Sequence, residues 1–503
     1  MDSKIRRIVI VVILWITKCV FGQFDPHFLP GRSVIVHLFE WKFKDIAVEC
    51  EDYLGPNSFG GVQVSPVNEY LISAGRAWWE RYQPVSYAII SRSGDEVEFA
   101  EMVKRCYNAG IRIYVDVVFN HMAAGDEEIV GTGGSVVYPP DRIYPHVPYG
   151  PEDFNDHCII TDYNNVNQVR NCELVHLPDL NQKSENVRRN VIEFLDRLID
   201  HGVAGFRADA CKHMWPEDIK YIFGNTKNLS KEFGFADHAR PFLYQEVIDL
   251  GTEPISKNEY TSNGVITEFL FSAEIGETFR KKKLKELIKW GTDERFLRSD
   301  RALVFVENHD NERGHGAGGE NILTYKDGKR YLMAVLFTLA HPYGITRIMS
   351  SYEFANSDEG PPMNADQEIL SPVFNERGLC TNGWICQHRW IGVAGMVQFR
   401  NAVAGRGIIN WADNGDQQVA FCRGDQGFVA FNGYTMSNLN STVKVCLPPG
   451  IYCDVISGTV TPNGCTGLEV IVNSAGYANI FIPGDSPTGV LAIHWGSAFI
   501  SEK

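Results

Sequence analysis

The alternation of strand-like and helix-like runs constrains this 503-residue chain more than any other feature. From Ser33 to about Gln398, apolar runs with strand character, such as 33–39 and 112–120, alternate with amphipathic helical runs at 187–202 and 272–290. This rhythm is typical of a parallel α/β architecture, because each parallel strand is connected to the next by a covering helix. After about residue 410 the helical periodicity stops. Short strand-like runs separated by Gly and Pro then predict a small all-β C-terminal domain.

The segment from Asn120 to about Gln182 interrupts this rhythm. It is rich in Pro, Gly, Asn and Asp, and it shows little periodicity. An ordinary loop of that length is uncommon in a compact domain. We therefore interpret residues 120–182 as an inserted subdomain.

The N-terminus is predicted to be a secretory signal peptide spanning residues 1–22. Lys4, Arg6 and Arg7 precede the apolar run 8–16, and small residues follow near Gly22. A membrane anchor is the weaker alternative, because the run is about half the length that a spanning helix needs. The formal charge of -15 and the pI near 5.4 argue against a nucleic-acid or anionic-membrane partner. We expect a secreted, extracellular protein.

The cysteine count agrees with an oxidising compartment. Of twelve cysteines, Cys19 lies in the predicted signal peptide, which leaves eleven. Five disulfides are expected: Cys50–Cys106, Cys158–Cys172, Cys380–Cys386, Cys422–Cys446 and Cys453–Cys465. Cys211 remains unpaired, and a small buried residue is a better interpretation of it than a reactive thiol. The sequons at Asn228 and Asn440 are compatible with glycosylation but do not decide it.

Four apolar runs end abruptly in charged or polar residues: 114–121, 205–213, 243–248 and 305–310. Asp209 and Glu246 are 37 residues apart, and Glu246 and Asp310 are 64 apart. One strand–helix unit of an eight-stranded barrel takes roughly 30 residues, so these gaps fit one unit and two units. The carboxyl ends of barrel strands form the active-site face, which makes the three acids candidate catalytic residues. Arg207 lies on the same strand face as Asp209, and a buried structural ion pair is the alternative for those two.

Several motifs in these runs and around them resemble those of animal α-amylases. They include "WWERYQPVSY", "GFRADACKHMWP", "QEVIDLG" and "VENHDNERGHGAGG". The resemblance covers nearly the whole mature chain. It implies a (β/α)8 TIM barrel, formed by 23–119 and 183–409. The irregular subdomain 120–182 is inserted after the third strand, and 410–503 form an all-β, Greek-key-like C-terminal β-sandwich domain.

The resemblance implies endohydrolysis of α-1,4-glucosidic bonds in starch, glycogen and maltooligosaccharides by a monomer. Asp209 matches the nucleophile, Glu246 the general acid/base, and Asp310 the third carboxylate of a retaining glycosidase. This chemistry needs a proton on Glu246 and an ionised Asp209, which Arg207 would help to maintain. A transglucosidase or maltase on the same barrel is an alternative. A catalytically inactive carbohydrate-binding module is another, but it would be favoured only if one of the three acids were lost.

The resemblance also implies substrate and ion sites. Residues that match sugar contacts are Trp78, Trp79, Tyr82, Gln83, His121, Tyr163, Lys212, Ile248, His309 and His315. A structural Ca²⁺ would be bound by Asn120, Asp179 and the backbone carbonyls of Arg170 and His213, all of them oxygen ligands. A Cl⁻ would be bound by Arg207, Asn308 and Arg347. The glycine-rich run 314–319 matches a mobile loop of the cleft, and no "GKS" or "GKT" follows it to suggest a phosphate loop.

The match is imperfect at a few positions. Glu307 stands where the family usually has Asp, and we expect its side chain to face away from Asn308 without loss of activity. Pro178 departs from the vertebrate form. Ile90 occupies a position of a disulfide that some vertebrate forms have, and Cys422–Cys446 looks like an additional bridge.

Overall fold

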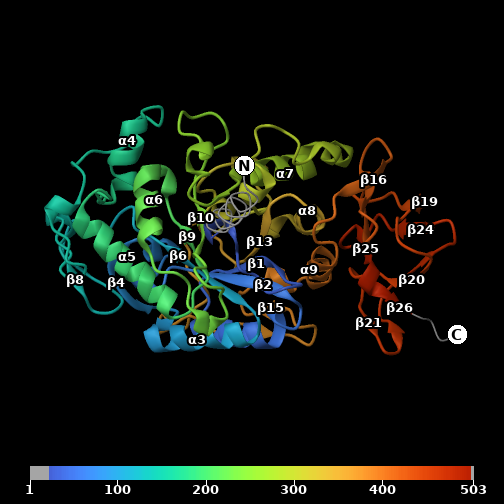
Figure 1. Ribbon diagram of the computed structural model, residues 1–503, viewed down its shortest axis with the longest axis horizontal. Helices are drawn as coiled ribbons and strands as arrows, with labels where there is room; N and C mark the ends of the chain where they lie inside the picture. Colours follow the sequence, from blue (N-terminus) through green and yellow to red (C-terminus); the bar gives the residue numbers. More distant parts are fainter. Residues whose placement is uncertain (1–21, 500–503) are drawn as a thin grey trace, which may run out of the picture.

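The computed structural model describes residues 22–499, so the predicted signal peptide lies almost wholly outside the described part of the chain (Figure 1). Eight parallel strands close into a barrel in the order β1-β13-β12-β11-β10-β9-β6-β2. This confirms the predicted TIM barrel. The strands are β1 (Ser33–Leu38), β2 (Phe59–Val64), β6 (Arg112–Val117), β9 (Gly205–Ala208), β10 (Phe242–Gln245), β11 (Val265–Thr267), β12 (Ala302–Val304) and β13 (Ile345–Ser350).

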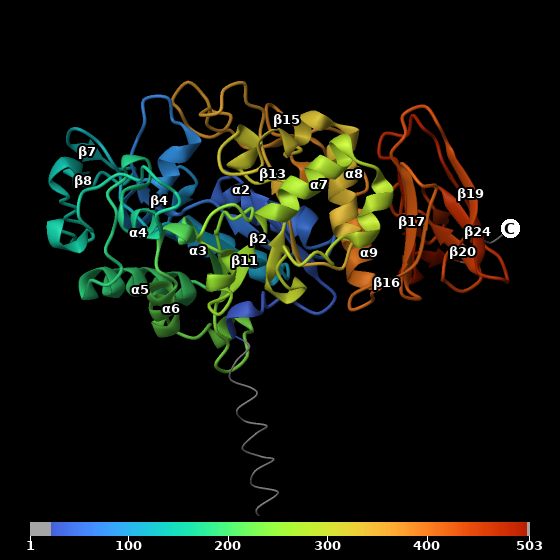
Figure 2. The same ribbon diagram turned by 90° about the horizontal axis from the view of Figure 1, so that it is seen from above.

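Helices cover the outside of this barrel (Figures 1 and 2). Their starts follow ordinary capping chemistry: the Asp95 side chain accepts from Glu98 N at α3, and the Ser184 side chain accepts from Val187 N at α5. The helices are α2 (Phe43–Glu49), α3 (Glu96–Asn108), α5 (Glu185–Asp200), α6 (Pro216–Asn225), α7 (Phe269–Lys281), α8 (Lys329–Ala340) and α9 (Val393–Ala402).

The single helix expected over 272–290 is wrong. α7 ends at Lys281, and a separate 3₁₀-helix spans Leu284–Lys289. Lys282 adopts an extended conformation between them and forms ion pairs back to Glu274 and Glu277 on α7. Lys282, the middle lysine of a run of three, thereby lies close to two carboxylates of α7.

The irregular segment follows β6, the third strand of the barrel, as expected. It carries β7 (Ile129–Val130), β8 (Val136–Val137) and α4 (Val166–Asn171). It does not stand alone: the connection from β2 to α3 forms a second small sheet, β3 (Asn68–Tyr70), β4 (Pro84–Ser91) and β5 (Gly94–Asp95), and Leu71 bridges to Gly131. β4 and β8 accordingly lie together at the end of the molecule away from the C-terminal domain (Figure 1).

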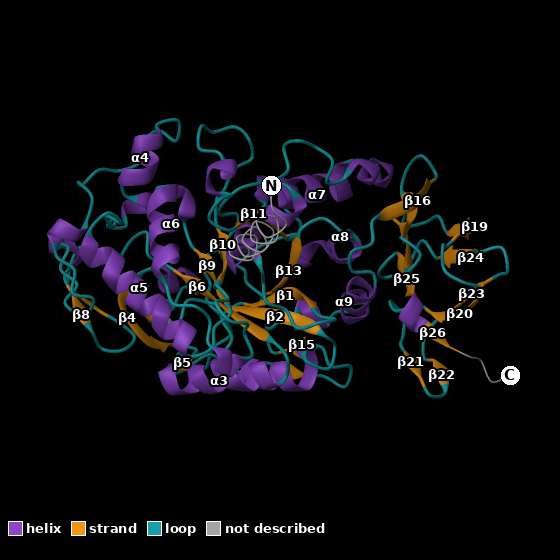
Figure 3. Cartoon of the chain, in the orientation of Figure 1, coloured by secondary structure: helices purple, strands orange, loops and turns teal. Residues whose placement is uncertain are grey.

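The C-terminal domain is all-β, as expected (Figure 3). Phe421 and Phe431 of its main sheet pack against Phe337 of α8, with ring centroids 6.3 and 5.8 Å apart, so the core continues from the barrel into this domain.

The main sheet joins β16 (Ile408–Asp413), β17 (Gln418–Arg423), β18 (Gly427–Asn432) and β25 (Val490–His494). The smaller sheets pair β19 (Leu439–Lys444) with β24 (Tyr477–Ile482), β20 (Gly450–Cys453) with β23 (Glu469–Val472) and β26 (Ala498–Phe499), and β21 (Val460–Thr461) with β22 (Gly464–Cys465). One further hairpin, β14 (Val373–Phe374) and β15 (Cys380–Thr381), belongs to the segment before α9.

The five expected disulfides are all formed, and Cys211 is buried without a disulfide partner among residues 22–499. In the same part of the chain, no helix combines the length and the apolar character that crossing a membrane would require.

Candidate active site

Arg207, on β9, is the centre of the candidate active site. Its side chain is 1% exposed, and its Nη1 donates to Asp209 Oδ1 at 2.8 Å. Its Nη2 donates to Glu246 Oε1, just after β10, at 2.5 Å, and lies 3.9 Å from Asp310 Oδ2. The three acids that lie far apart in the sequence therefore meet around one guanidinium after the carboxyl ends of β9, β10 and β12. A simple two-residue ion pair between Arg207 and Asp209 does not describe this arrangement.

The backbone after β9 contributes to the same cluster. Ala210 adopts a left-handed conformation, with φ of 49°, which is uncommon for a residue other than glycine. Its N–H donates to Glu246 Oε2 at 2.9 Å. Asn308 donates from Nδ2 to Asp310 Oδ2 at 3.3 Å. Each carboxylate thus has a partner that fixes its orientation.

Asp116 is a functional residue to which the sequence analysis gave no role. It lies on β6 directly opposite Arg207 in the β6–β9 register, and both of its oxygens accept from Arg207 Nη1, at 2.7 and 2.9 Å. Tyr82 donates to Asp116 Oδ2 at 3.0 Å. The signal in the sequence was an acidic residue within the apolar run 112–120, but the partner strand could not be known from it.

The charge balance of the cluster differs from the expectation that Asp209 stays ionised. Burial, and then the charge of Glu246, raise the pKa of the Asp209 carboxyl well above its ordinary value, although Arg207 opposes the shift. Burial and Glu246 likewise raise the pKa of Asp310 to about 7. The physical reason is that four carboxylates, including that of Asp116, share one guanidinium, so the cluster retains protons more strongly than isolated acids do.

An aromatic cluster borders the carboxylates. Trp78 and Tyr82 lie on a short 3₁₀-helix, Trp78–Tyr82, and not on a strand, and both pack against His309. The rings of Tyr82 and His309 are stacked with centroids 5.1 Å apart, and Trp78 is 5.8 Å from His315. Both ring nitrogens of His309 are buried without a hydrogen-bond partner among the described residues.

The other predicted sugar contacts form two groups that differ in their contacts. His121 donates from Nε2 to the Tyr82 carbonyl at 2.9 Å, and Gln83 Oε1 accepts from Ala124 N at 3.0 Å. Trp79 is partly buried against the core next to Trp78. His121 and Gln83 thus connect the Trp78–Tyr82 helix to the inserted segment.

Lys212, Ile248 and Tyr163 form a second group, to which the inserted segment contributes Tyr163. Lys212 donates to the Ile248 carbonyl at 2.8 Å, pairs with Glu253, and lies 5.7 Å from the centre of the Tyr163 ring. Sequence reasoning missed Glu253, because no regular pattern connects it to the strand that carries Lys212. Tyr163 is 42% exposed, so one face of this group remains open.

Comparisons with known proteins agree with this geometry. Residues 52–240 match the family model described as the α-amylase catalytic domain, and residues 408–496 match that of the α-amylase C-terminal all-β domain. The α-amylase-related protein of Drosophila dossoui is 53% identical over 489 residues, covering 96% of this chain and 98% of the relative. That of Drosophila willistoni is 53% identical over 475 residues, covering 94% and 96%. The chain belongs to the α-amylase family.

Solved structures of α-amylase I from Eisenia fetida share the fold. A glutamate-to-glutamine variant in complex with maltohexaose is 42% identical, with a TM-score of 0.88, and the match covers 94% of this chain and 99% of that one. The wild-type enzyme is 43% identical with the same TM-score. A γ-cyclodextrin glucanotransferase from Bacillus clarkii has a TM-score of 0.65 at 15% identity, which shows a similar fold only.

The residues proposed for Ca²⁺ form two pairs, Asn120 with Asp179 and Arg170 with His213. Leu180 N donates to the Asn120 carbonyl at 2.9 Å, and Asp179 pairs with His121 in the adjoining bridge. His213 donates from Nδ1 to the Val169 carbonyl at 2.9 Å, which brings its backbone beside Arg170. Among residues 22–499 no group of three His, Cys, Asp or Glu side chains suits a metal ion, and the proposed set contains only one such ligand, Asp179. Asn120 Oδ1, however, is buried there without a hydrogen-bond partner, which fits a hard cation.

The residues proposed for Cl⁻ show a similar unpartnered group. Arg347, on β13, donates from Nη1 to Gln63 Oε1 at 2.8 Å, whereas its Nη2 is buried with no partner among the described residues. Burial, with a contribution from Arg207, lowers the pKa of Arg347. Gln63 Nε2 in turn donates to Asp116 at 3.4 Å, which connects Arg347 to the carboxylate cluster. The orphaned Nη2 fits an anion, although the Nη atoms of Arg207 already contact carboxylates.

Glu307 faces away from Asn308, as expected. Its carboxylate accepts a hydrogen bond from Tyr331 of α8, whereas the Asn308 side chain turns to Asp310 and to Asn311 N. Burial raises the pKa of Glu307 well above its ordinary value. Glu307, which departs from the family pattern, therefore faces α8 and contacts none of the three candidate catalytic acids.

Proposed function

We propose that this protein is a secreted α-amylase that hydrolyses internal α-1,4-glucosidic bonds in starch, glycogen and maltooligosaccharides with retention of the anomeric configuration. The observation that carries the proposal is the convergence of Asp209, Glu246 and Asp310 on Arg207 at the carboxyl face of the barrel. Adjacent nitrogens of one guanidinium hold Asp209 and Glu246. This suits the separation of about 5–5.5 Å between the two carboxyl groups of retaining glycosidases. The Eisenia fetida structure adds support, because its bound maltohexaose is an α-glucan oligomer.

In the proposed mechanism, protonated Glu246 donates its proton to the glycosidic oxygen while Asp209 attacks the anomeric carbon. The bond to the leaving sugar breaks, and a covalent glycosyl-enzyme forms on Asp209. Glu246, now ionised, takes a proton from water, which displaces Asp209 and restores both groups. Arg207 favours the ionised form of Asp209 through its hydrogen bond, and Asp310 stabilises the positive charge that develops on the sugar ring.

We further propose that the protein binds Ca²⁺ and Cl⁻. Asn120, Asp179 and the carbonyls of Arg170 and His213 would hold Ca²⁺, which would link the inserted segment to the barrel. Arg347, Asn308 and Arg207 would hold Cl⁻, whose negative charge favours the protonated form of a neighbouring acid. The unpartnered Asn120 Oδ1 and Arg347 Nη2 support these two assignments.

Secretion and the monomeric state also belong to the proposal. The five disulfides within residues 22–499 suit an oxidising compartment, and the N-terminal sequence suits a signal peptide. The substrate would be a polysaccharide. Neither a nucleic acid nor a membrane is expected as a partner.

The decisive experiment measures starch hydrolysis by the wild type and by Asp209→Asn and Glu246→Gln variants. Each substitution should lower kcat by at least about 1000-fold with little change in folding, because it removes the nucleophile or the proton donor. Asp300→Asn, an exposed acid on the surface, is the matched control and should retain full activity. Full activity of Asp209→Asn, or product released with inverted configuration, would contradict the mechanism.

Product analysis separates the alternatives. An α-amylase releases mixed maltooligosaccharides from the interior of starch, whereas a maltase releases glucose and a transglucosidase builds new linkages. A protein that binds starch but hydrolyses no α-glucan would be an inactive binding module.

A further inference from the structure

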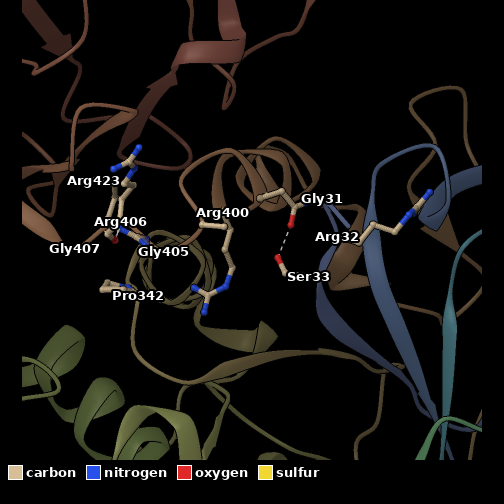
Figure 4. A pocket seen from close by; sticks show the side chains of 11 residues that line it. Gly31, Arg32, Ser33, Pro342, Arg400, Gly405, Arg406, Gly407 and Arg423 are labelled. Atoms are coloured by element: carbon tan, nitrogen blue, oxygen red, sulfur yellow. Dashed lines mark hydrogen bonds between the residues drawn. The ribbon is translucent and has the colours of Figure 1, made fainter. Parts of the chain in front are cut away.

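A cavity of about 430 Å³ lies between the barrel and the C-terminal domain (Figure 4). Its wall comes from the residues that lead into β1, the α8–β13 turn, the end of α9 and the end of β17. Ser33, the first residue of β1, belongs to this wall. The cavity therefore lies at the amino ends of the barrel strands, on the face opposite the carboxylate cluster, and is a separate site.

The wall of this cavity is strongly cationic. No acidic side chain lines it, and its four lining arginines are Arg32, Arg400, Arg406 and Arg423. The guanidinium of Arg32 donates to the carbonyls of Gly55 and Phe59 and points away, so the other three supply the charge (Figure 4). Within residues 22–499, the one carboxylate found within 4 Å of these guanidinium groups is that of Asp425, 3.8 Å from Arg406. Both members of that pair are largely exposed, so the contact contributes little. The cavity thus carries an excess of positive charge.

Two of the arginines are held in place by neutral backbone oxygens. Arg400 donates to the carbonyls of His341 at 2.6 Å and Gly344 at 2.7 Å. Arg423, which is 3% exposed, donates to the carbonyls of Arg406 at 2.9 Å and of Ala340, the last residue of α8. These bonds cap the carboxyl end of a helix, and so they explain why the arginines are fixed. Carbonyl dipoles do not cancel two full charges, however.

The electrostatic cost of this arrangement appears in the pKa values of three basic groups: Arg400, Arg423 and His341. Burial lowers the pKa of Arg400 to about 10. Burial, and then Arg400, lower that of Arg423 to about 9. Burial together with both arginines lowers the pKa of His341 to about 3. Any negative charge that entered the cavity would relieve this mutual repulsion.

The cavity also has open space beside its backbone. Gly31, Gly405 and Gly407 line it, and a Cβ atom added to any of them would meet no heavy atom within 4 Å. Arginine guanidinium groups match the geometry of phosphate and sulfate oxygens through paired N–H donors.

We propose that this cavity is a binding site for an oxyanion of the phosphate or sulfate type, either free or as the monoester of a sugar. The bound anion contacts arginines of both domains: Arg400 at the end of α9 and Arg406 shortly after it belong to the barrel part, and Arg423 on β17 belongs to the C-terminal domain. It therefore holds the C-terminal domain against the barrel and stabilises the folded protein without changing the catalytic centre.

The test uses the full mature protein at a fixed, saturating chloride concentration. Gly407→Asp supplies a carboxylate from the wall of the cavity itself, and Gly407→Asn is the matched neutral control. Gly407 has no left-handed φ and has open space at its Cβ position, so both side chains are tolerated. Radiolabelled inorganic phosphate is measured by equilibrium dialysis, and Tm is measured against phosphate concentration with sodium chloride at equal ionic strength as reference.

We expect wild type and Gly407→Asn to bind about one phosphate per chain and to gain about 1–3 °C in Tm, in a saturable manner. Gly407→Asp should bind at least 10-fold more weakly, gain no saturable Tm increase, and have a higher Tm than Gly407→Asn in phosphate-free buffer. Glucose 6-phosphate compared with glucose then shows whether a monoester is accepted. Equal Tm increases in all three proteins would mean a general salting effect and overturn the proposal, as would dialysis without bound phosphate.

Discussion

Asp116 offers the sharpest test of how the cleft controls its protons. Asp116→Asn keeps the size of the side chain but removes the negative charge that contacts Arg207 through two oxygens. Arg207 is then shared among fewer carboxylates, and it interacts more strongly with Asp209. Both effects favour ionised Asp209, since the charge of Asp116 is one of the causes that raise its pKa. The acidic limb of kcat/KM should therefore move to lower pH.

The magnitude follows from the geometry. Asp116 and Asp209 each place an oxygen within 2.8 Å of the same Nη1 atom, so their charges lie about 5 Å apart. At an effective dielectric constant of about 20, two like unit charges at that distance repel by about 3 kcal/mol. This is an upper bound, because Arg207 lies between them. We expect a displacement of about one pH unit and a loss of about 2–3 kcal/mol in the free energy of unfolding, because Arg207 loses one buried partner.

The assay is kcat/KM on starch between pH 4 and 9 at fixed chloride, together with thermal unfolding. Glu49→Gln is the matched control, since Glu49 is also a buried carboxylate paired with an arginine, Arg389, but lies on α2 outside the cluster. It should lose comparable stability and leave the pH profile unchanged. An acidic limb that stays in place in Asp116→Asn, or moves to higher pH, would refute the reasoning.

Four further outcomes follow from the structure. A chelator should lower the Tm of the wild type by several degrees but should not change the Tm of the Asp179→Asn variant. Calorimetry measures both values. Arg347→Gln should abolish the dependence of starch hydrolysis on chloride while the folded structure persists by circular dichroism. Glu307→Asp and Tyr331→Phe should each cost about 1 kcal/mol in chemical denaturation, with non-additive effects in the double variant and kcat within about twofold of wild type. In the mature protein, from which the predicted signal peptide with Cys19 has been removed, a thiol reagent should find no reactive group in the native state and one per chain after denaturation, that of buried Cys211.

The sequence was sufficient for elements whose signal is local. The strands β1 and β6 lie within apolar runs expected to be strands, and α5, Glu185–Asp200, overlaps the helical run expected at 187–202. The disulfides and the three acids also followed from the residues and the motifs that carry them. The barrel closure agrees with the spacing of 37 and 64 residues between those acids.

Features that depend on register and on distant segments could not be predicted. Asp116 and Arg207 are opposed because β6 pairs with β9 in one particular register, and nothing local in either run specifies it. α7 ends at Lys281, where Lys282 pairs with Glu274 and Glu277, and a periodicity argument takes no account of such contacts. The arginine-lined cavity joins four segments of the chain that share no motif.

The number of charges in the carboxylate cluster explains why β9 carries Arg207. Asp116, Asp209, Glu246 and Asp310 all lie within 4 Å of that one guanidinium. Four buried carboxylates cannot all ionise against a single positive charge, so the cluster holds at least one proton near neutral pH. A retaining glycosidase needs one proton and one ionised carboxylate at the same moment. In the proposed mechanism the excess of acids supplies this proton, and Arg207 opposes the rise in the pKa of Asp209. Removal of either side of this balance should then cost activity even where the fold survives.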